Sequence, residues 1–361
     1  MTSDFDFIIV GQGIAGSLLA HELIDSGKKL LVIDKFQPFS SSRIAAGIIH
    51  PITGRRLAKS WMADELIPFA EKRYKDLGAQ LNEQFYSRID ILEVLHSIRE
   101  QNDWNAKQTE PGFGDYLDNK FESENYSPVL KPFRQLVRIK KSGWLNLSMF
   151  LDASLKRITD QGTLFNEEFV DEACIAHPDG IEYNKLKAKA IIYCEGWNAS
   201  KNPLWSWLPF SPAKGELLTI HAPDFPETNI INRGIFILPL GNHLFRVGST
   251  FSWNELNSET SDAARHAILE KLDQLISVPY EVIEHVAGVR PSNKDRRPFI
   301  GEHPTQKKHF IFNGLGSKGV LLAPYFAKQL ADHLLNGTKI NPEADISRYE
   351  NLFHKRAQAL E

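Results

Sequence analysis

The stretch FDFIIVGQGIAGSLLAHELIDSGKKLLVID, residues 5–34, decides the fold. Residues 5–10 form an apolar, β-branched run, which is typical of a buried strand. Glycines follow, and apolar residues then recur at helical spacing from Leu18 to Ile24. Gly27 ends this helix, and residues 29–33 form a second apolar run. The stretch therefore predicts a strand, a tight turn, a helix and a second strand parallel to the first.

The glycine turn between strand and helix predicts a dinucleotide site. Gly11 makes the turn, Gly13 lets a phosphate approach the backbone, and Gly16 allows the helix to pack on the strand. Backbone N–H groups and the helix N-terminus can hold a pyrophosphate there. Asp34 lies 23 residues after Gly11, where a carboxylate accepts hydrogen bonds from ribose hydroxyls. A glycine-rich turn followed by a surface aspartate is the alternative interpretation.

The composition limits the class of protein. The 361 residues, 42% of them hydrophobic, can bury a large core and predict two domains. A net charge of −3 gives no overall field toward nucleic acid or anionic lipid. The acidic start and the lack of a long apolar run predict a soluble, cytoplasmic protein. Cys174 and Cys194 lack the spacing of a disulfide framework or a zinc site, and we expect no metal.

The remaining chain alternates between helical and strand-like patterns. Residues 61–77 have helical spacing, and residues 102–128 are mixed and rich in loops. Two further helices are expected, at about 145–159 and 261–275. Strands are expected at residues 164–170, 181–183, 190–194, 217–220, 235–238, 244–247 and 310–312. A glycine-rich turn over 313–319 and a helix to about residue 335 follow the last strand.

This pattern predicts an α/β protein whose Rossmann-type dinucleotide domain is built from three separate stretches of the chain. A substrate domain of α+β type, with a mixed and largely antiparallel sheet, is expected between these stretches. The expected boundaries are 1–78, 144–205 and 286–345 for the dinucleotide-binding domain, 79–143 and 206–285 for the substrate domain, and 346–361 for a C-terminal tail.

Further segments decide which dinucleotide is bound. They occur in the order Ser40–Pro51, Pro212–Glu216, Leu238–Thr250, Gly288–Gly301 and Asn313–Gly319. In this order they resemble the D-amino-acid oxidase (DAO) superfamily of FAD enzymes, most closely its glycine oxidase branch. The resemblance covers nearly the whole chain from Phe5 to about Gly337, and residues 288–324 are its most specific part. It implies a flavoprotein oxidoreductase that binds FAD on the Rossmann-type domain.

The resemblance also implies positions around FAD. Asp34 and Lys35 would lie at the adenosine ribose, Ser42 and Arg43 near the pyrophosphate, Gly47, Ile48 and Ile49 beside the isoalloxazine ring, and the backbone of Val170 at the adenine. Further contacts are implied for Gly11, Gly13, Ile14, Ala15, Gly16, Gly196, Leu315, Gly316, Ser317, Lys318, Gly319, Val320 and Leu321. The helix after Gly319 would direct its positive end at flavin N1–C2=O. Val170 could equally be a core strand residue, and Ala45–Gly47 a plain close-packed turn.

Ile44 and Ser292 stand where relatives in this superfamily attach the flavin covalently, so FAD is expected to be noncovalent. Arg290, in Gly-Val-Arg-Pro, would bind the substrate carboxylate with two parallel hydrogen bonds. The alternative is an arginine paired with Asp295 or Glu302. His50 is a candidate to face the flavin ring, and the alternative is a structural histidine beside Pro51.

Two departures from glycine oxidases concern the substrate. Phe236 replaces an active-site tyrosine and Ser317 replaces a second arginine, so carboxylate recognition would rest on Arg290 alone. The resemblance implies oxidation of the C–N bond of an amino acid or N-substituted amino acid, with oxygen or another acceptor reoxidising the flavin. Two alternatives are an oxidase acting on a modified tRNA, with Arg55, Arg56 and Lys59 as a small basic patch, and a non-catalytic flavin-bearing sensor.

Overall fold

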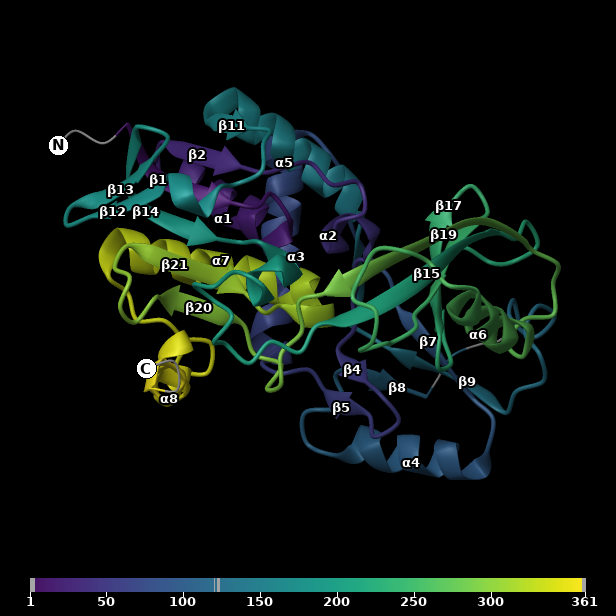
Figure 1. The fold of residues 1–361 in the computed structure, drawn as a ribbon. Helices are drawn as coiled ribbons and strands as arrows, with labels where there is room; N and C mark the ends of the chain where they lie inside the picture. Colours follow the sequence, from purple (N-terminus) through teal and green to yellow (C-terminus); the bar gives the residue numbers. More distant parts are fainter. Residues whose placement is uncertain (1–3, 120, 122–123, 359–361) are drawn as a thin grey trace.

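The computed structural model describes residues 4–119, 121 and 124–358, which form two neighbouring lobes (Figure 1). The first lobe is built on a sheet whose central strands are parallel. Across the sheet these strands are β11 (Thr163–Phe165), β2 (Leu30–Ile33), β1 (Phe5–Val10), β14 (Leu186–Tyr193) and β21 (His309–Asn313). Three antiparallel strands complete it: β20 (Phe299–Glu302) beside β21, and β13 (Gly180–Tyr183) with β12 (Cys174–His177) beside the start of β14.

Both faces of this sheet are buried, which explains the continuous apolar runs in its strands. Ile9 faces a layer of four helices, whereas Ile8 faces a second layer that contains Trp205 and Trp207. The four helices are α1 (Ile14–Asp25), α3 (Ala63–Leu81), α5 (Leu147–Gln161) and α7 (Gly319–Asn336). Residues after 345 form η4 (Ile346–Tyr349) and α8 (Glu350–Gln358), and Phe353 packs against Trp207 with ring centroids 5.1 Å apart.

The second lobe contains a sheet that is antiparallel apart from one pair of strands, β16 and β7. Its order is β19 (Glu281–Arg290), β15 (Ala213–His221), β18 (Leu244–Gly248), β17 (Phe236–Gly241), β16 (Ile230–Asn232), β7 (Ile91–Leu95), β9 (Gln135–Ile139) and β8 (Leu117–Asp118). Helix α6 (Asp262–Asp273) packs Ile268 and Leu272 on one face. The other face turns toward the first lobe.

Short elements complete the first lobe and the connections between the two sheets. They are α2 (Ser41–Ile44), the small sheet of β3 (Ile48–Ile49), β10 (Gly143–Leu145) and β6 (Tyr86–Arg88), the hairpin of β4 (Ile52–Thr53) and β5 (Ala58–Lys59), and the 3₁₀ turns η1 (Asp171–Ala173), η2 (Gly196–Ser200) and η3 (Gly316–Lys318). The expected domain division stays a proposal. It is supported by the separate strand sets of the two sheets, although β19 runs across the proposed boundary before residue 286.

Two local predictions were wrong. Residues 102–128, expected to be mixed and loop-rich, include most of helix α4 (Ile98–Thr109). Ser97 and Glu100 form a capping box at its start, and this sequence signal was missed because only Trp104 is buried along the helix. The strand expected at 164–170 ends at Phe165, and Val170 lies exposed before η1.

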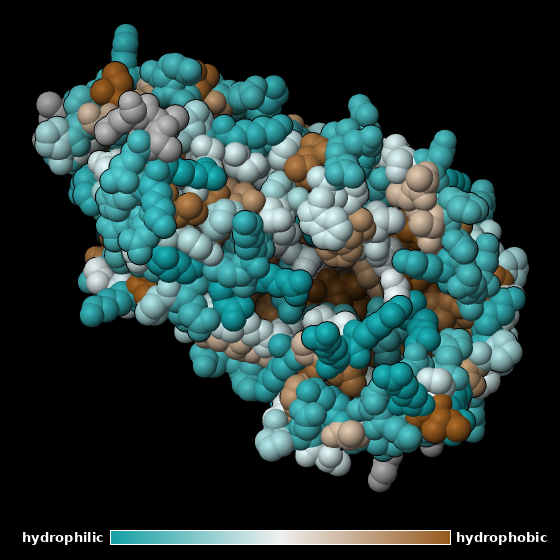
Figure 2. Space-filling model, turned by 60° about the horizontal axis from the view of Figure 1, so that its bottom comes forward, coloured by the Kyte–Doolittle hydropathy of each residue, from teal (hydrophilic) through white to brown (hydrophobic). Residues whose placement is uncertain are grey.

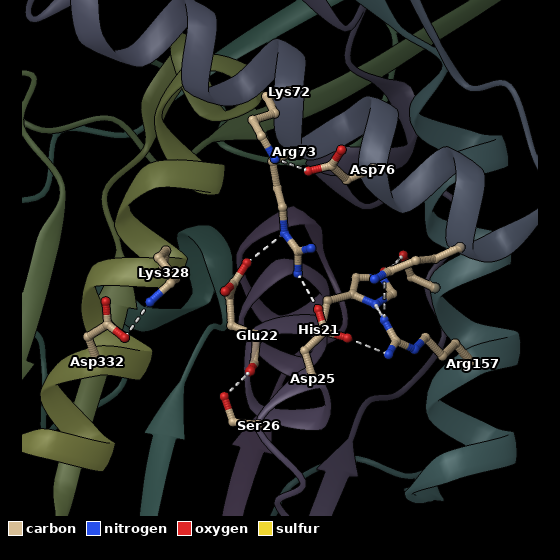
Figure 3. A network of polar contacts seen from close by, with 12 residues as sticks. His21, Glu22, Asp25, Ser26, Lys72, Arg73, Asp76, Arg157, Lys328 and Asp332 are labelled. Atoms are coloured by element: carbon tan, nitrogen blue, oxygen red, sulfur yellow. Dashed lines mark hydrogen bonds and ion pairs between the residues drawn. The ribbon is translucent and has the colours of Figure 1, made fainter.

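Largely buried ion pairs join helix α1 to helices α3 and α5. Figure 3 shows Arg73 reaching from α3 to Glu22 and Asp25 of α1, while Arg157 approaches Asp25 from α5. The ion pairs measure 2.6 Å for Arg73–Glu22, 2.9 Å for Arg73–Asp25 and 2.6 Å for Arg157–Asp25. Arg157 also donates to His21 Nδ1, so His21 Nε2 carries the hydrogen that bonds Ser154 Oγ. Burial and the two arginines lower the pKa of His21 to about 3, which keeps this histidine neutral.

We expect Asp25→Asn to lower the free energy of unfolding by about 1–3 kcal/mol at pH 7, because two largely buried arginines lose this carboxylate, although Arg73 keeps Glu22. Burial opposes ionisation of Asp25, but the hydrogen bonds from Arg157 and Arg73 outweigh it and lower its pKa. The stabilisation by Asp25 is therefore complete above the ordinary aspartate pKa of about 4. It declines as the pH falls through the lower pKa that Asp25 has in the folded protein. Urea unfolding between pH 3 and 7 measures this dependence.

The matched control is Asp76→Asn, which removes a surface pair with Lys72 on the same helix as Arg73. Such exposed pairs contribute at most about 0.5 kcal/mol. Equal destabilisation by the two variants would contradict the role assigned to Asp25.

Candidate functional site

The glycine turn joins β1 to α1 in a close approach that only glycine permits. A Cβ atom on Gly16 would lie 1.9 Å from the Gly11 carbonyl oxygen, so any side chain there would push the helix away from the strand. Gly11 itself has a φ of +100° and lies against the Cys194 carbonyl at the end of β14. The N–H of Ile14, in the first turn of α1, donates to Ser42 Oγ at 3.1 Å. A Cβ atom on Gly13 would lie 3.0 Å from the same Ser42 Oγ, so the backbone of the turn is exposed to close approach only because this residue is glycine.

The predicted ribose-binding carboxylate lies at this turn. Asp34 follows β2, and its Oδ2 accepts a hydrogen bond from the N–H of Gln12 at 2.7 Å. Burial raises the pKa of Asp34, against the opposing effects of this hydrogen bond and the charge of Arg43. Lys35 instead points outward and pairs with Glu168 at 2.9 Å. Asp34 is therefore placed against the glycine turn, whereas the side chain of Lys35 is not.

Helix α2 brings Arg43 next to the same turn. Its guanidinium lies 4.6 Å from the ring centroid of Phe36 and pairs with Asp152 at 2.8 Å. Its Nη2 atom is buried and has no hydrogen-bond partner. A buried donor without an acceptor costs free energy, so an anionic ligand next to Ser42 and Arg43 would satisfy it.

Segments that are distant in sequence close around the turn. The side-chain amide of Asn313, at the end of β21, donates to the Gly196 carbonyl at 2.9 Å. The N–H of Gly316 donates to the Pro291 carbonyl at 3.2 Å. Gly11, Gly196 and Gly316 therefore lie in three connected loops at the same ends of neighbouring strands. Val170, the residue expected at the adenine, has an exposed side chain. Its N–H donates to the hydroxyl of Tyr183, in β13, at 3.4 Å.

The sheet face that meets this region is lined with glycine. Leu217 pairs with Gly248 and Val286, and Gly248 pairs with Phe236, so these four residues share one face of the sheet. Ile44 of α2 packs on them. A Cβ atom on Gly288 would lie 2.1 Å from Ile44 Cδ1, so this glycine lets α2 lie directly on the sheet.

Arg290 lies on the same face, four residues beyond Val286. Its guanidinium donates to the carbonyls of Lys214 and Thr250 at 3.3 Å and to Ser249 Oγ at 2.9 Å. It also lies 4.1 Å from the ring centroid of Phe251. A Cβ atom on residue 215 would come within 2.0 Å of Arg290 Nη2, so Gly215 provides the space that the guanidinium occupies.

Among the residues that the structure describes, no carboxylate pairs with Arg290. The alternative partners proposed from the sequence bind elsewhere: Asp295 pairs with Arg348 at 3.0 Å, and Glu302 pairs with Lys307 at 3.2 Å. Burial alone lowers the pKa of Arg290 to about 10. A largely buried cation with only neutral acceptors around it lacks a counter-charge, which would favour an anion beside it.

The other predicted substrate residues surround the same region. His50 follows β3, and its Nδ1 atom is buried without a partner, while burial and the nearby Lys318 lower its pKa to about 4. Phe236 packs with Ile44 and Leu217, and Ser317 lies in η3. Sequence reasoning missed Ser249, Phe251 and Ser60, since no motif marks a residue that acts by contacting a neighbour from another strand.

The arrangement fits a dinucleotide with a flat ring system. The glycine turn, Ser42 and the unpartnered Arg43 nitrogen suit the phosphates, and Asp34 suits a ribose. The segment from Gly47 to His50 follows α2 in the chain, and Ile44 of α2 packs on the glycine-lined sheet face. Figure 2, which brings the underside forward, shows a hollow with a hydrophobic floor near the middle of the molecule, bordered by hydrophilic side chains.

Comparisons with known proteins agree with this geometry. The family model "FAD dependent oxidoreductase" (DAO) matches residues 6–333. The glycine oxidase of Bacillus subtilis (strain 168) is 30% identical over 93% of this chain and 94% of its own length. A tRNA 5-methylaminomethyl-2-thiouridine biosynthesis bifunctional protein of Hahella chejuensis is 24% identical over 92% of this chain and 56% of its own length. The glycine oxidase structure from Geobacillus kaustophilus superposes with a TM-score of 0.78 at 19% identity, covering 96% of this chain and 98% of that one. The chain therefore belongs to the DAO family of FAD dependent oxidoreductases, and its cofactor is FAD.

Proposed function

We propose that this enzyme oxidises the C–N bond of an amino acid or an N-substituted amino acid whose carboxylate is bound by Arg290. The observation that supports it is the largely buried Arg290 guanidinium, which has only neutral acceptors around it among the described residues. A substrate carboxylate would supply the missing charge through two parallel hydrogen bonds.

The residues around Arg290 would orient the substrate. FAD, held by the glycine turn, Ser42 and Arg43, would supply the hydride acceptor for the carbon of the C–N bond, and water would hydrolyse the imine product to a carbonyl compound and ammonia or an amine. Arg290 would fix the carboxylate end, and Gly215 leaves the space that the guanidinium occupies. Phe236 and Leu217 provide an apolar wall that excludes water beside the reacting carbon. A neutral amine needs no general base for this step, so the chain's role is to bind, orient and exclude water.

A substrate screen tests this proposal. Amino acids, N-methyl amino acids and hydroxy acids are added to the purified flavoprotein under argon, and bleaching of the flavin absorbance is recorded. Bleaching by an amino acid or its N-methyl derivative supports the proposal, and bleaching by hydroxy acids alone contradicts it. A protein that no compound reduces, but that still binds carboxylates, would be a sensor instead.

The proposed substrate is a small molecule rather than RNA. On the hairpin of β4 and β5, Lys59 is already paired with Asp64, which leaves Arg55 and Arg56 as the exposed basic residues of the predicted patch. Two exposed arginines provide little phosphate neutralisation. Retention of tRNA that weakens steeply with salt would instead favour the RNA alternative. Within the described part of the chain, no helix combines the length and apolar character needed to cross a bilayer.

We expect acid denaturation to release all of the flavin into the supernatant, where it should chromatograph as FAD. The reason is that Ile44 and Ser292 occupy the positions used for covalent attachment in relatives, and neither side chain can form such a bond. Absorbance of the pellet and supernatant at the flavin maximum measures the outcome. Yellow colour retained in the pellet would refute noncovalent binding.

A further inference from the structure

A second buried cation lies beside the proposed site. Lys318, at the end of η3, donates from Nζ to Ser60 Oγ at 2.8 Å. Ser60 is buried and donates in turn to the His50 carbonyl at 2.9 Å. The unpartnered Nδ1 atom of His50 belongs to the same group. Lys318, Ser60 and His50 therefore combine a cation, a hydroxyl and a buried ring nitrogen, none of which carries a negative charge.

Two basic residues near Lys318 each have a carboxylate partner, whereas Lys318 has none among the described residues. Lys59 pairs with Asp64, and Arg297 pairs with Glu343 at 3.1 Å. Within residues 4–119, 121 and 124–358, no carboxylate lies within ion-pair distance of Lys318. Burial, together with the charges of Arg296 and Arg297, lowers the pKa of Lys318 to about 8. The protein thus keeps an ammonium group largely buried without the counter-charge that such a group normally has.

The Lys318 loop is bonded directly to the segment that carries Arg290. Gly316 donates to the carbonyl of Pro291, the residue after Arg290. A Cβ atom on Gly316 would lie 3.5 Å from Ser292 Oγ, in ordinary contact. His50 follows the segment expected beside the flavin ring. The two cations therefore belong to adjoining loops, and a single carboxylate on Arg290 would leave Lys318 without an anion.

We propose that Lys318, with Ser60 and His50, binds a second acidic group of the substrate, so that the preferred substrate carries two acidic groups. This inference rests on the proposed function, because it takes Arg290 as the first anchor. It also changes the expectation that Arg290 alone recognises the anion: the arginine missing at Ser317 is replaced by the neighbouring lysine. The resemblance instead places Lys318 along the flavin, and the experiment separates these two roles.

Binding of unreactive acids to the holoenzyme tests the proposal. Butyrate and succinate, and pentanoate and glutarate, form two pairs of equal chain length that differ in the second carboxylate. Their dissociation constants are measured from the shift they cause in the flavin absorption spectrum. We expect at least one diacid to bind about tenfold or more tightly than its monoacid. Lys318→Gln should abolish this preference while leaving monoacid binding within about twofold.

Lys59→Gln is the matched control, because it removes a neighbouring lysine that already has a carboxylate, and it should leave both constants unchanged. Equal binding of the monoacids and diacids by the unsubstituted enzyme would overturn the proposal, whatever the stability of the variant. So would a Lys318→Gln variant whose flavin midpoint potential shifts while its diacid preference persists, since the cation would then act on the flavin. If neither kind of acid binds and no amine bleaches the flavin, the proposed function itself fails.

Discussion

Replacing Arg290 with alanine should lower the rate of anaerobic flavin reduction by the best substrate at least about a hundredfold. A guanidinium–carboxylate pair in a largely buried site loses about 2–5 kcal/mol when one partner is removed, and each 1.4 kcal/mol is tenfold in rate. The substrate's charge would lose its partner, whereas the carbonyls of Lys214 and Thr250 and the Ser249 hydroxyl can be hydrated. Stopped-flow absorbance under argon measures the effect on kcat/KM.

The flavin content of Arg290→Ala should be normal, because Arg290 does not contact the glycine turn. Ile44 of α2 packs on Leu217 and Val286 rather than on Arg290. Arg290→Lys should also be slow, since an ammonium cannot form two parallel hydrogen bonds with a carboxylate. Arg297→Ala serves as the control, because that arginine pairs with Glu343 and should change the rate by less than about twofold. Reduction of Arg290→Ala at the original rate would show that another group binds the carboxylate.

Gly16→Ala should weaken FAD binding at least about tenfold and produce a largely colourless protein. The added Cβ atom would overlap the Gly11 carbonyl at 1.9 Å, so α1 must move away from β1. This movement would displace the Ile14 N–H and the helix N-terminus, where the pyrophosphate is expected to bind. The ratio of flavin to protein absorbance, followed by titration of the apoprotein with FAD, measures the loss.

Gly114→Ala is the matched control for Gly16→Ala. A Cβ atom there would lie 3.6 Å from the Gln108 carbonyl, which is an ordinary contact, and its FAD content should match that of the unsubstituted protein. Full occupancy in Gly16→Ala would mean that α1 tolerates the shift and that the close approach is not required.

The parts of the fold that follow from local rules could be predicted from the sequence. Residues 5–34 predict the strand, turn and helix because one short stretch holds all the signals: the spacing of the apolar residues, the positions of the glycines, and Asp34. Helix α4 was missed because its sequence is polar and its one buried residue, Trp104, gives no apolar period. Its capping box was the available signal.

The site residues were likewise predictable only where a local motif marked them. The Gly-Val-Arg-Pro segment pointed to Arg290, but nothing in the sequence indicated that Ser249 and Phe251 lie beside it, since strand pairing across 41 and 39 positions decides that contact. Lys318 was assigned to the flavin because it lies in a flavin-binding segment. Its lack of a counter-charge becomes visible only when the positions of Asp64, Glu343 and the other acids are known.

The sheet of the first lobe has a consequence for the order of events during synthesis. Strand β1 is made first, yet β21 and α7, which complete the loops around Gly11, come from residues 309–336. A ribosome-bound chain that ends before Asn313 lacks the side chain that ties Gly196 in place. We therefore expect FAD to bind only after nearly the whole chain has been synthesised. Until then the apolar faces of β1 and β14 lack some of the neighbours that bury them in the folded protein, which favours aggregation of the nascent chain.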